Sequence, residues 1–438
     1  MIKVFMIVNS PGLAARIFEP SSEEKRKYAA SIYGKKKTAR KSLEEIKGEL
    51  KELRIKNRNK IDENIENFKT TLQSYPFIKV HSVSSAKTLA GVIREHASGT
   101  TLISLNKSNV VINEIRPYLD DLGFKSYVRY FSELEILSPE KKFFKDYWML
   151  PSLHERNLIE TFDLKMSFNL YRKEKNRDYV AVLGVNAASA RTGNLYFLQH
   201  MGNIGKDLKD ARTLFLIVPI EKIVENDDDA TIHVKSMGIF GLESVILDIA
   251  IDKKELYDFE SLPVVDKKRE IHVVIFDNGR RRLISTPYSD LLLCIDCRAC
   301  ARQCPVGKHI PLPKGVIYSP KNLLLLNLQE RIGPFEFCLH CGRCEIECPC
   351  GIPLPELLWK AEMEYYEKKG RPIIKMAFDN PEFLAKLGVL FSPVSNWAMK
   401  FPLVRLIMNF FPGIHTKAKL PSFSRKTFRE WYEGQKYG

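Results

Sequence analysis

The feature that most constrains this chain is a cysteine pattern that occurs twice in a short segment. All nine cysteines of the 438-residue sequence lie between Cys294 and Cys350, and eight of them form two copies of C-x2-C-x2-C-x3-C-P, beginning at Cys294 and at Cys338. Three thiolates with this spacing let one loop hold three corners of an iron-sulfur cubane, whereas zinc sites usually join two distant cysteine pairs. The repeat therefore predicts two 4Fe-4S clusters.

The fourth cysteine of each copy has a separate expected role. In two-cluster ferredoxins this residue reaches across to the neighbouring cluster. By that rule one cluster is held by Cys294, Cys297, Cys300 and Cys348, and the other by Cys338, Cys341, Cys344 and Cys304. The proline after each fourth cysteine ends a short helix and turns the chain back across the site.

The sequence also suggests roles for Cys350 and His340. Cys350 belongs to neither copy, and we expect an inert buried thiol rather than a redox-active one. His340 lies inside the second copy, where it either tunes a cluster through a hydrogen bond or is simply a surface residue.

Length and composition leave room for two or three domains. The sequence is 45% hydrophobic and 28% charged, as in globular proteins, and no apolar run approaches the ~20 residues that span a bilayer, so we expect no transmembrane helix. Residues 1–9 are apolar but lack a clear cleavage site, which favours a buried strand over a signal peptide. Cysteines gathered in one segment, rather than spread through a disulfide framework, indicate the cytoplasm.

The charge is positive and uneven. The net charge is +15, and residues 21–60 contain fourteen Lys/Arg against six Glu. Within them Leu43, Ile46, Leu50 and Leu53 recur at helical spacing, which predicts a basic helical N-terminal segment over residues 1–60. Such a helix either packs an apolar stripe on its own domain or presents a docking surface.

The next part of the chain has the pattern of an α/β domain, which we place at residues 61–265. Short apolar runs alternate with helical patterns, as expected for a largely parallel sheet. We expect helices at residues 86–96 and 109–122, and strands at residues 78–83, 101–105, 126–131, 179–183, 195–198 and 213–218.

The residue composition and the hydrophobic pattern of the sequence change after this domain. Residues 266–289 read as a connector hairpin, with a strand from residue 270 and the turn Asp277-Asn278-Gly279. Residues 290–370 are Leu-rich and contain the cysteines, which predicts an α-helical dicluster ferredoxin domain. Residues 371–438 form an amphipathic aromatic tail that Pro393, Pro402 and Pro412 divide into helices too short to cross a membrane.

Several stretches of the α/β part resemble the LUD domain of lactate-utilisation proteins. They are residues 184–194, Gly202-Asn203 and residues 219–224, and residues 270–280 resemble the segment that joins this domain to the dicluster ferredoxin in the family's iron-sulfur subunit. The order of parts, ending in Phe428-Arg429-Glu430-Trp431, is similar to that subunit over most of the chain. The resemblance implies a fold related to sugar-phosphate isomerases and CoA transferases (NagB/CoA-transferase-like), and a role in oxidising L-lactate to pyruvate within a multisubunit system.

Small and polar residues flank one strand of the LUD-like part and form a candidate ligand site. These residues are Asn186, Thr192, Gly193, Asn194, Gly202 and Asn203. They suit close approach of the backbone to a ligand, and they equally suit tight turns in a packed sheet. No complete nucleotide loop and no flavin fingerprint accompanies them. Because oxidation of a hydroxy acid removes two electrons and usually needs a flavin or nicotinamide, a catalytic partner is expected.

The leading hypothesis is an iron-sulfur electron-transfer subunit that relays electrons from a partner dehydrogenase toward a quinone-linked or soluble acceptor. The expected partners are a flavin-containing dehydrogenase, a cysteine-rich oxidoreductase subunit, or both. The 2-hydroxy acid would be L-lactate, and the tail would contact other subunits or the inner face of the membrane. The alternatives are a subunit of another flavin dehydrogenase or of a heterodisulfide-reductase-like complex, and a LUD-domain metabolite-binding enzyme with redox-sensing clusters. A nucleic-acid protein is disfavoured, because the basic residues are not interleaved with aromatic ones.

Overall fold

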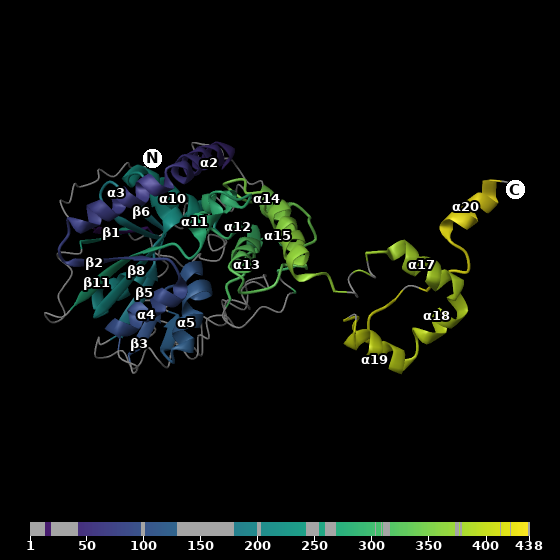
Figure 1. Cartoon of the computed structure of the whole chain (residues 1–438). Helices are drawn as coiled ribbons and strands as arrows, with labels where there is room; N and C mark the ends of the chain where they lie inside the picture. The colour runs from purple at the N-terminus through teal and green to yellow at the C-terminus, as the bar shows by residue number, and fades with distance from the viewer. Residues whose placement is uncertain are drawn as a thin grey trace, which may run out of the picture. The chain divides into compact units, whose positions relative to one another are not determined.

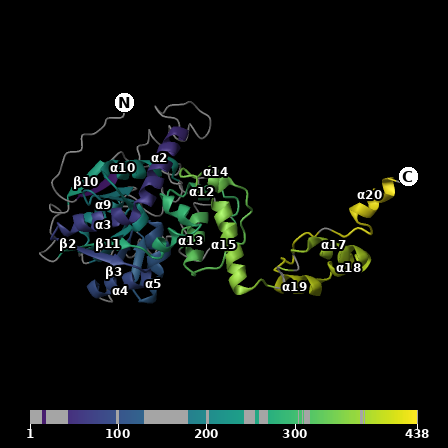
Figure 2. The ribbon, with the colours of Figure 1, turned by 45° about the horizontal axis from the view of Figure 1, so that its top comes forward.

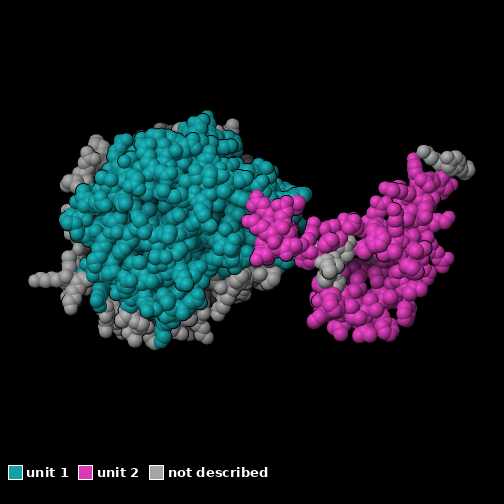
Figure 3. Space-filling view, viewed as in Figure 1, with its two compact units in different colours: residues 1–361 teal, residues 362–438 magenta. Residues whose placement is uncertain are grey.

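The protein is described here by a computed structural model that divides the chain into two compact units, Met1–Ala361 and Glu362–Gly438 (Figure 3). The structure describes residues 14–18, 43–97, 101–128, 179–198, 203–241, 254–258, 269–302, 304–307, 309, 316–372, 376, 379–411, 413–420 and 422–436. Among these residues no helix combines the length and the apolar character needed to cross a membrane. The expected strand at residues 1–9 lies outside the described residues.

A six-stranded sheet forms the centre of the first unit. Its order is β2-β11-β8-β5-β3-β4, and all its pairings are parallel. The strands are β2 (Ile78–Val83), β3 (Leu102–Leu105), β4 (Lys125–Val128), β5 (Tyr179–Gly184), β8 (Thr213–Pro219) and β11 (Glu270–Phe276). The expected strands at residues 78–83, 101–105, 179–183 and 213–218 are therefore present, and the one at 126–131 is present as far as residue 128.

Successive side chains of the central strands face two different hydrophobic cores. In β8, Phe215 and Ile217 pack in one core, while Leu214, Leu216 and Val218 pack in the other. This alternation follows from the two-residue period of a strand, and it explains why these strands are apolar almost throughout.

Helices cover both faces of this sheet (Figure 1). The core that contains Phe215 is closed by α4 (Ala86–His96), the π-helical turn η1 (Val110–Ile115) and α5 (Arg116–Asp121). The opposite core is closed by α2 (Leu43–Asn59), α3 (Ile61–Gln73), α9 (Asn203–Asp210) and the cysteine segment. Residues 86–96 form the expected helix.

The expected helix at residues 109–122 changes its geometry part of the way along. Pro117 has no backbone N–H, so it cannot donate to the carbonyl of Asn113 as a continuous α-helix would require. That carbonyl accepts a hydrogen bond from the Arg331 side chain instead. The wider turn before Pro117 also directs the buried side chains of Asn113 and Glu114 toward later parts of the chain.

A second sheet of five strands lies in the same unit, in the order β10-β1-β7-β6-β9. The strands are β1 (Ala14–Phe18), β6 (Ala187–Ser189), β7 (Leu195–Leu198), β9 (Ile223–Val224) and β10 (Lys254–Asp258). The expected strand at residues 195–198 is β7. Helix α10 (Asp227–Phe240) packs on this sheet through Ala230 and Val234, which contact Tyr196 in a small separate core.

The basic helix α2 packs against its own unit. Leu50 is fully buried, and the Arg54 guanidinium donates hydrogen bonds to the carbonyls of Glu221, Leu292 and Leu293 at 2.6, 2.8 and 3.1 Å. The face of α2 that carries these residues is therefore not free to dock a partner. Residues 19–42 of the predicted basic segment lie outside the described residues.

The cysteine segment belongs to the same unit as the sheet and shares its core. Its helices are α11 (Arg280–Leu283), η5 (Ser289–Leu293), α12 (Ala299–Arg302), α13 (Pro320–Leu328), α14 (Arg343–Ile346) and α15 (Leu354–Lys369), of which the residues from Glu362 on belong to the second unit. Figures 1 and 2 show α12, α13 and α14 gathered beside the first half of α15. The predicted fold class, an α/β part followed by a helical dicluster part, is confirmed.

The segment predicted as a connector hairpin has a different structure. β11 lies between β2 and β8 as a central parallel strand, and α11 follows it after the turn at Gly279. The difference has a physical reason: Val273, Val274 and Ile275 are all buried, so this strand needs neighbours and cores on both sides. Residues 270–276 are part of the α/β sheet, and the cysteine segment continues directly from it.

The second unit is built from short helices, α17 (Pro381–Leu390), α18 (Ser392–Ala398), α19 (Pro402–Phe410) and α20 (Phe428–Lys436). Proline stands in the first turn of α17, α18 and α19, where its missing N–H costs nothing. Asn396 exchanges two hydrogen bonds of 2.8 Å with the backbone of Phe423, and a Cβ at Gly388 would lie 2.3 Å from the Phe423 ring. This contact requires glycine and closes the unit.

Candidate iron-sulfur centre

The two cysteine loops have the same backbone conformation. Asp296 and Arg298 have positive φ angles of 60° and 63°, and His340 and Gly342, at the matching positions of the second loop, have φ angles of 48° and 74°. Left-handed residues at alternate positions turn successive N–H groups toward one side and form an anion-binding concavity. The Asp296 N–H accordingly lies 3.3 Å from the sulfur of Cys294.

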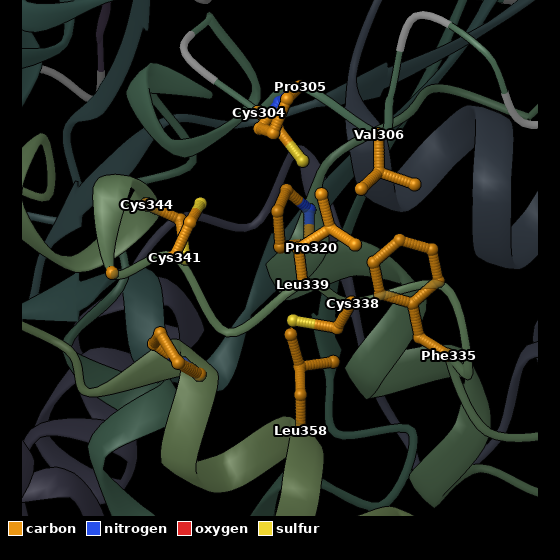
Figure 4. A pocket seen from close by; sticks show the side chains of 12 residues that line it. Cys304, Pro305, Val306, Pro320, Phe335, Cys338, Leu339, Cys341, Cys344 and Leu358 are labelled. Atoms are coloured by element: carbon orange, nitrogen blue, oxygen red, sulfur yellow. The ribbon is translucent and has the colours of Figure 1, made fainter. Parts of the chain in front are cut away.

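One hollow collects a complete predicted ligand set. Its volume is about 340 Å³, including space open to solvent, and its lining contains Cys304 together with Cys338, Cys341 and Cys344 (Figure 4). The rest of the lining is apolar and includes Phe335 and Leu358. The structure thus brings the fourth cysteine of the first copy to the first three cysteines of the second.

The other predicted set is also brought together. Burial raises the pKa of Cys297 well above its usual value, and charge on Cys294 and Cys348 raises it further. Burial also raises the pKa of Cys300, and charge on Cys294 and Cys348 raises it further. Cys348 therefore lies close to the first three cysteines of the first copy. An ion pair between Arg302 and Glu347 joins the two short helices from which the fourth cysteines follow.

The thiol chemistry of both sets fits an iron-sulfur cluster. Burial raises the pKa of Cys294 to about 11 and that of Cys344 to about 12, and nearby thiolates act in the same direction. Four thiols grouped closely oppose one another's ionisation unless positive charge is present among them, and metal centres deprotonate the thiols that ligate them. When bound, a 4Fe-4S cluster supplies one-electron redox chemistry at such a site.

Three buried charges hold the first cysteine loop in place. Asp296 pairs with Lys222 at 3.1 Å and with Lys321 at 2.7 Å. Burial alone would raise the pKa of Asp296, but these two ammonium groups hold it well below its usual value. Lys222 also donates to the carbonyl of Cys294 at 3.1 Å. No pattern in the sequence indicates this ionic group, although Lys222 lies within the LUD-like residues 219–224.

A buried tyrosine contacts one of the candidate ligands. The Tyr318 hydroxyl donates a hydrogen bond of 2.9 Å to the sulfur of Cys304. Gly307 makes room for the tyrosine, because a Cβ at this position would lie 2.0 Å from the ring. Hydrogen bonds to ligand sulfurs help to set cluster potentials, so Tyr318 is a second functional residue that the sequence alone did not indicate.

Cys350 and His340, the other two residues considered from the sequence, occupy structural positions. Cys350 is 1% exposed, in agreement with the expected buried thiol. His340 is exposed, and its ring contacts Trp359 edge-to-face at a centroid distance of 4.8 Å. Of the two expectations for His340, the position fits a surface residue.

Two residues of the candidate ligand site in the LUD-like part converge on a carboxylate. Asp227 accepts hydrogen bonds from Thr192 Oγ1 at 2.8 Å, Asn194 Nδ2 at 2.7 Å and Tyr196 Oη at 2.5 Å. Burial acts to raise the pKa of Asp227, but these hydrogen bonds hold it below its usual value. Ser189 is a fourth donor at 3.1 Å. The polar groups of Thr192 and Asn194 are thus used to hold the turn against α10.

The other residues of that candidate site are not gathered around a ligand. Asn186 binds the Leu198 N–H at 2.8 Å, and Gly193 occupies a turn with a φ of 75°. Gly202 lies outside the described residues, and Asn203 is the first residue of α9. Among the described residues these positions support the alternative of tight turns in a packed sheet.

Similar proteins support the assignment of the cysteine segment as an iron-sulfur site. Residues 290–352 match the family described as "4Fe-4S dicluster domain". The chain is similar to "Lactate utilization protein B" of Bacillus cytotoxicus (strain DSM 22905 / CIP 110041 / 391-98 / NVH 391-98), with 26% identity over 280 residues, which are 59% of this chain and 57% of the relative. "Lactate utilization protein B 2" of Bacillus mycoides (strain KBAB4) gives 26% over 278 residues, again 59% and 57%.

The match spans less than two thirds of the length of these relatives. No solved structure matches the chain. The resemblance to lactate-utilisation proteins is confirmed by the named relatives, and the iron-sulfur prediction by the family match. Residues 290–352 therefore carry a 4Fe-4S dicluster domain, and the chain is similar to the proteins named lactate utilization protein B.

Proposed function

We propose that the chain binds two 4Fe-4S clusters and that each fourth cysteine serves the cluster of the other loop. The observation that carries this proposal is the shared hollow of Cys304, Cys338, Cys341 and Cys344. The proximity of Cys348 to Cys294 and Cys297 supports the matching set. This exchange places both clusters in one fold, because neither loop supplies four ligands to a single site.

We infer that the protein is the iron-sulfur electron-transfer subunit of a system that oxidises a 2-hydroxy acid, with L-lactate as the substrate. The relatives named for lactate utilisation support this assignment. Removing a hydride equivalent from such an acid releases two electrons, and a flavin-containing dehydrogenase can hold both before passing them on singly. The chain then accepts electrons one at a time and delivers them to a cysteine-rich oxidoreductase subunit or another acceptor in the cytoplasm.

A metabolite-binding role for the LUD-like part has weaker support. Thr192 and Asn194 are two of the residues that would contact a ligand, but their side chains donate hydrogen bonds to Asp227 instead. Electron transfer through the cysteine segment needs no such site and remains the better explanation.

We further propose that the second unit contacts an anionic membrane surface from the cytoplasmic side. Leu403, Leu406, Ile407 and Phe410 are exposed and recur at the spacing of one helical face of α19. Residues 371–438 contain eleven Lys/Arg against four Asp/Glu. An apolar helix face combined with positive charge is typical of helices that lie in the interface of an anionic bilayer.

The exchange of ligands predicts how iron is lost from paired cysteine variants. Cys304→Ser alone should lose about half of the iron, and Cys304→Ser with Cys341→Ser should lose no more, because both serve one cluster. Cys304→Ser with Cys300→Ser should lose nearly all of it. Iron per chain after anaerobic reconstitution measures this, and Cys350→Ser is the control that keeps its full content. The reverse pattern for the two pairs would show that each loop keeps its own fourth cysteine.

The Tyr318→Phe variant should change the reduction potential of only one of the two clusters. Removing its hydroxyl in Tyr318→Phe takes a hydrogen bond from the Cys304 sulfur, and the more negative reduced state loses more stabilisation than the oxidised state. The potential of the cluster that uses Cys304 should fall, while the other stays within error. Redox titration followed by electron paramagnetic resonance gives both values. An equal shift of both clusters, or an upward shift, would contradict this role.

The proposed place in lactate oxidation predicts that the chain alone does not react with its substrate. L-lactate should leave the visible absorption of the oxidised protein unchanged, whereas L-lactate together with a flavin-containing dehydrogenase that co-purifies from the native host should bleach it. D-lactate and a Cys304→Ser, Cys300→Ser variant are the controls. Turnover of lactate by the chain without the flavoprotein would favour a catalytic LUD-like part and end the proposal.

Membrane contact predicts a difference between two substitutions in one helix. Leu406→Glu and Asn409→Glu add the same charge to α19, but only the first removes a side chain from the exposed apolar face. Burial of a leucine contributes about 1.5–3 kcal/mol, so the first variant should bind anionic vesicles more than about tenfold more weakly than the second. The fraction of protein that sediments with vesicles of phosphatidylserine or of phosphatidylcholine measures the binding. Equal binding of both variants, or no binding of the wild type, would refute membrane contact.

A further inference from the structure

A cluster of histidine and glutamate lies at the opposite end of β11 from the cysteine segment. His96 is the last residue of α4, and Glu270 and His272 stand at the start of β11. One potential ligand atom from each of the three lies within 4.8 Å of the others. The cysteine segment continues from the other end of this strand, so the cluster is separate from the iron-sulfur site.

The geometry of the three side chains is close to that of a tetrahedral metal site. His96 Nδ1 lies 3.0 Å from Glu270 Oε2, and His272 Nε2 lies 3.2 Å from the same oxygen. In a tetrahedral zinc site, bonds of about 2.0–2.2 Å place neighbouring ligand atoms roughly 3.3 Å apart. The ligand atoms of the two histidines lie within 4.8 Å of each other, so a metal ion would draw them together, and His96 has room to move because it stands partly exposed at the end of its helix.

Neighbouring groups orient this donor set. His272 is fully buried, its ring stacks on Phe215 at a centroid distance of 4.4 Å, and its Nδ1 is 2.9 Å from His81 Nε2. The His272 Nε2 is thereby aimed at Glu270, as in metal sites where the second ring nitrogen is held by another group. Lys79 binds the other carboxylate oxygen, Oε1, at 2.7 Å. This leaves Oε2 as the oxygen that faces both histidines.

The protonation states suit a metal ion at neutral pH. The hydrogen bond from Lys79 lowers the pKa of Glu270 to about 2, so the carboxylate is ionised. Burial lowers the pKa of His272 to about 4, so its imidazole is neutral. Metal ligands must be deprotonated, and the surroundings of Glu270 and His272 favour the carboxylate and the neutral imidazole that can bind a metal ion.

We propose that His96, Glu270 and His272 bind one divalent metal ion, with Zn²⁺ as the ion that their geometry and donor types fit. Imidazole nitrogen and carboxylate oxygen are donors that zinc accepts, and three protein ligands leave a fourth position for water. The site would fasten the end of α4 to the start of β11, and because His96 and Glu270 are partly exposed the fourth position opens to solvent.

The test uses the full chain with its iron-sulfur clusters loaded, so that the cysteines are occupied. Zn²⁺ is added anaerobically, unbound ion is removed, and zinc and iron are measured by plasma mass spectrometry. The wild type should retain one zinc per chain without losing iron. Competition with a chromophoric chelator should show at least a tenfold weaker affinity in His96→Ala and in Glu270→Gln, which change partly exposed residues and preserve the core.

Two further variants make the assignment specific. His81→Phe should weaken zinc binding about 10- to 100-fold, because it removes the group that orients His272. His415→Ala, an exposed histidine of the second unit, should bind as the wild type does. Zinc retention that is unchanged in His96→Ala and Glu270→Gln would overturn the proposal. Absence of zinc from the loaded wild type would also overturn it and leave these residues as a hydrogen-bonded cluster.

Discussion

A pair of neighbouring charges in one turn joins the α/β sheet to the cysteine segment. Glu221 and Lys222 follow directly after β8, and both are buried. Glu221 pairs with Arg280 at 2.8 Å, and Arg280 also pairs with Glu114 at 2.6 Å, while Lys222 pairs with Asp296 beside Cys294. Leaving one buried partner unpaired costs about 3–5 kcal/mol, so these groups fix the turn, the end of β11 and the first cysteine loop relative to one another.

This ionic connection explains why the cysteine segment is not a separate module in the fold. A free ferredoxin-like domain would need its own core, but here Leu291, Leu292 and Leu293 pack in the same core as β8, and Arg54 of α2 donates hydrogen bonds to the carbonyls of Leu292 and Leu293. Loops that hold clusters must be rigid before the cofactor arrives, because ligands placed loosely bind metal poorly. The sheet supplies that rigidity from one side, and the paired short helices supply it from the other.

The sequence predicted those features that depend on local pattern. The central strands and α4 follow from apolar runs and helical spacing, and the cysteine sets follow from a repeat whose spacing matches one kind of cofactor. It did not predict the strands β1, β6, β9 and β10. β6 and β9 have only three and two residues, β1 begins with two alanines, and β10 is mostly charged, so none of them shows the apolar run of β-forming residues that marks a strand. Asp296, Lys321 and Tyr318 were also missed, since each acts through a contact made only in the folded chain. The end of β11 was mistaken for a hairpin because the Asp277-Asn278-Gly279 turn resembles a hairpin signal.

The polar side chains between β6 and β7 make their hydrogen bonds within the fold. Thr192 and Asn194 belong to the ligand site expected from the sequence, yet both donate to Asp227, as Tyr196 does, and α10 begins at this carboxylate. A buried carboxylate that accepts several hydrogen bonds is stabilised as an anion and holds its donors in place. These side chains therefore support the second sheet, and through β9 and Lys222 that sheet leads to the first cysteine loop. We propose that the LUD-like part serves as the scaffold of the cysteine segment and that the two-electron chemistry of a hydroxy acid belongs to a partner.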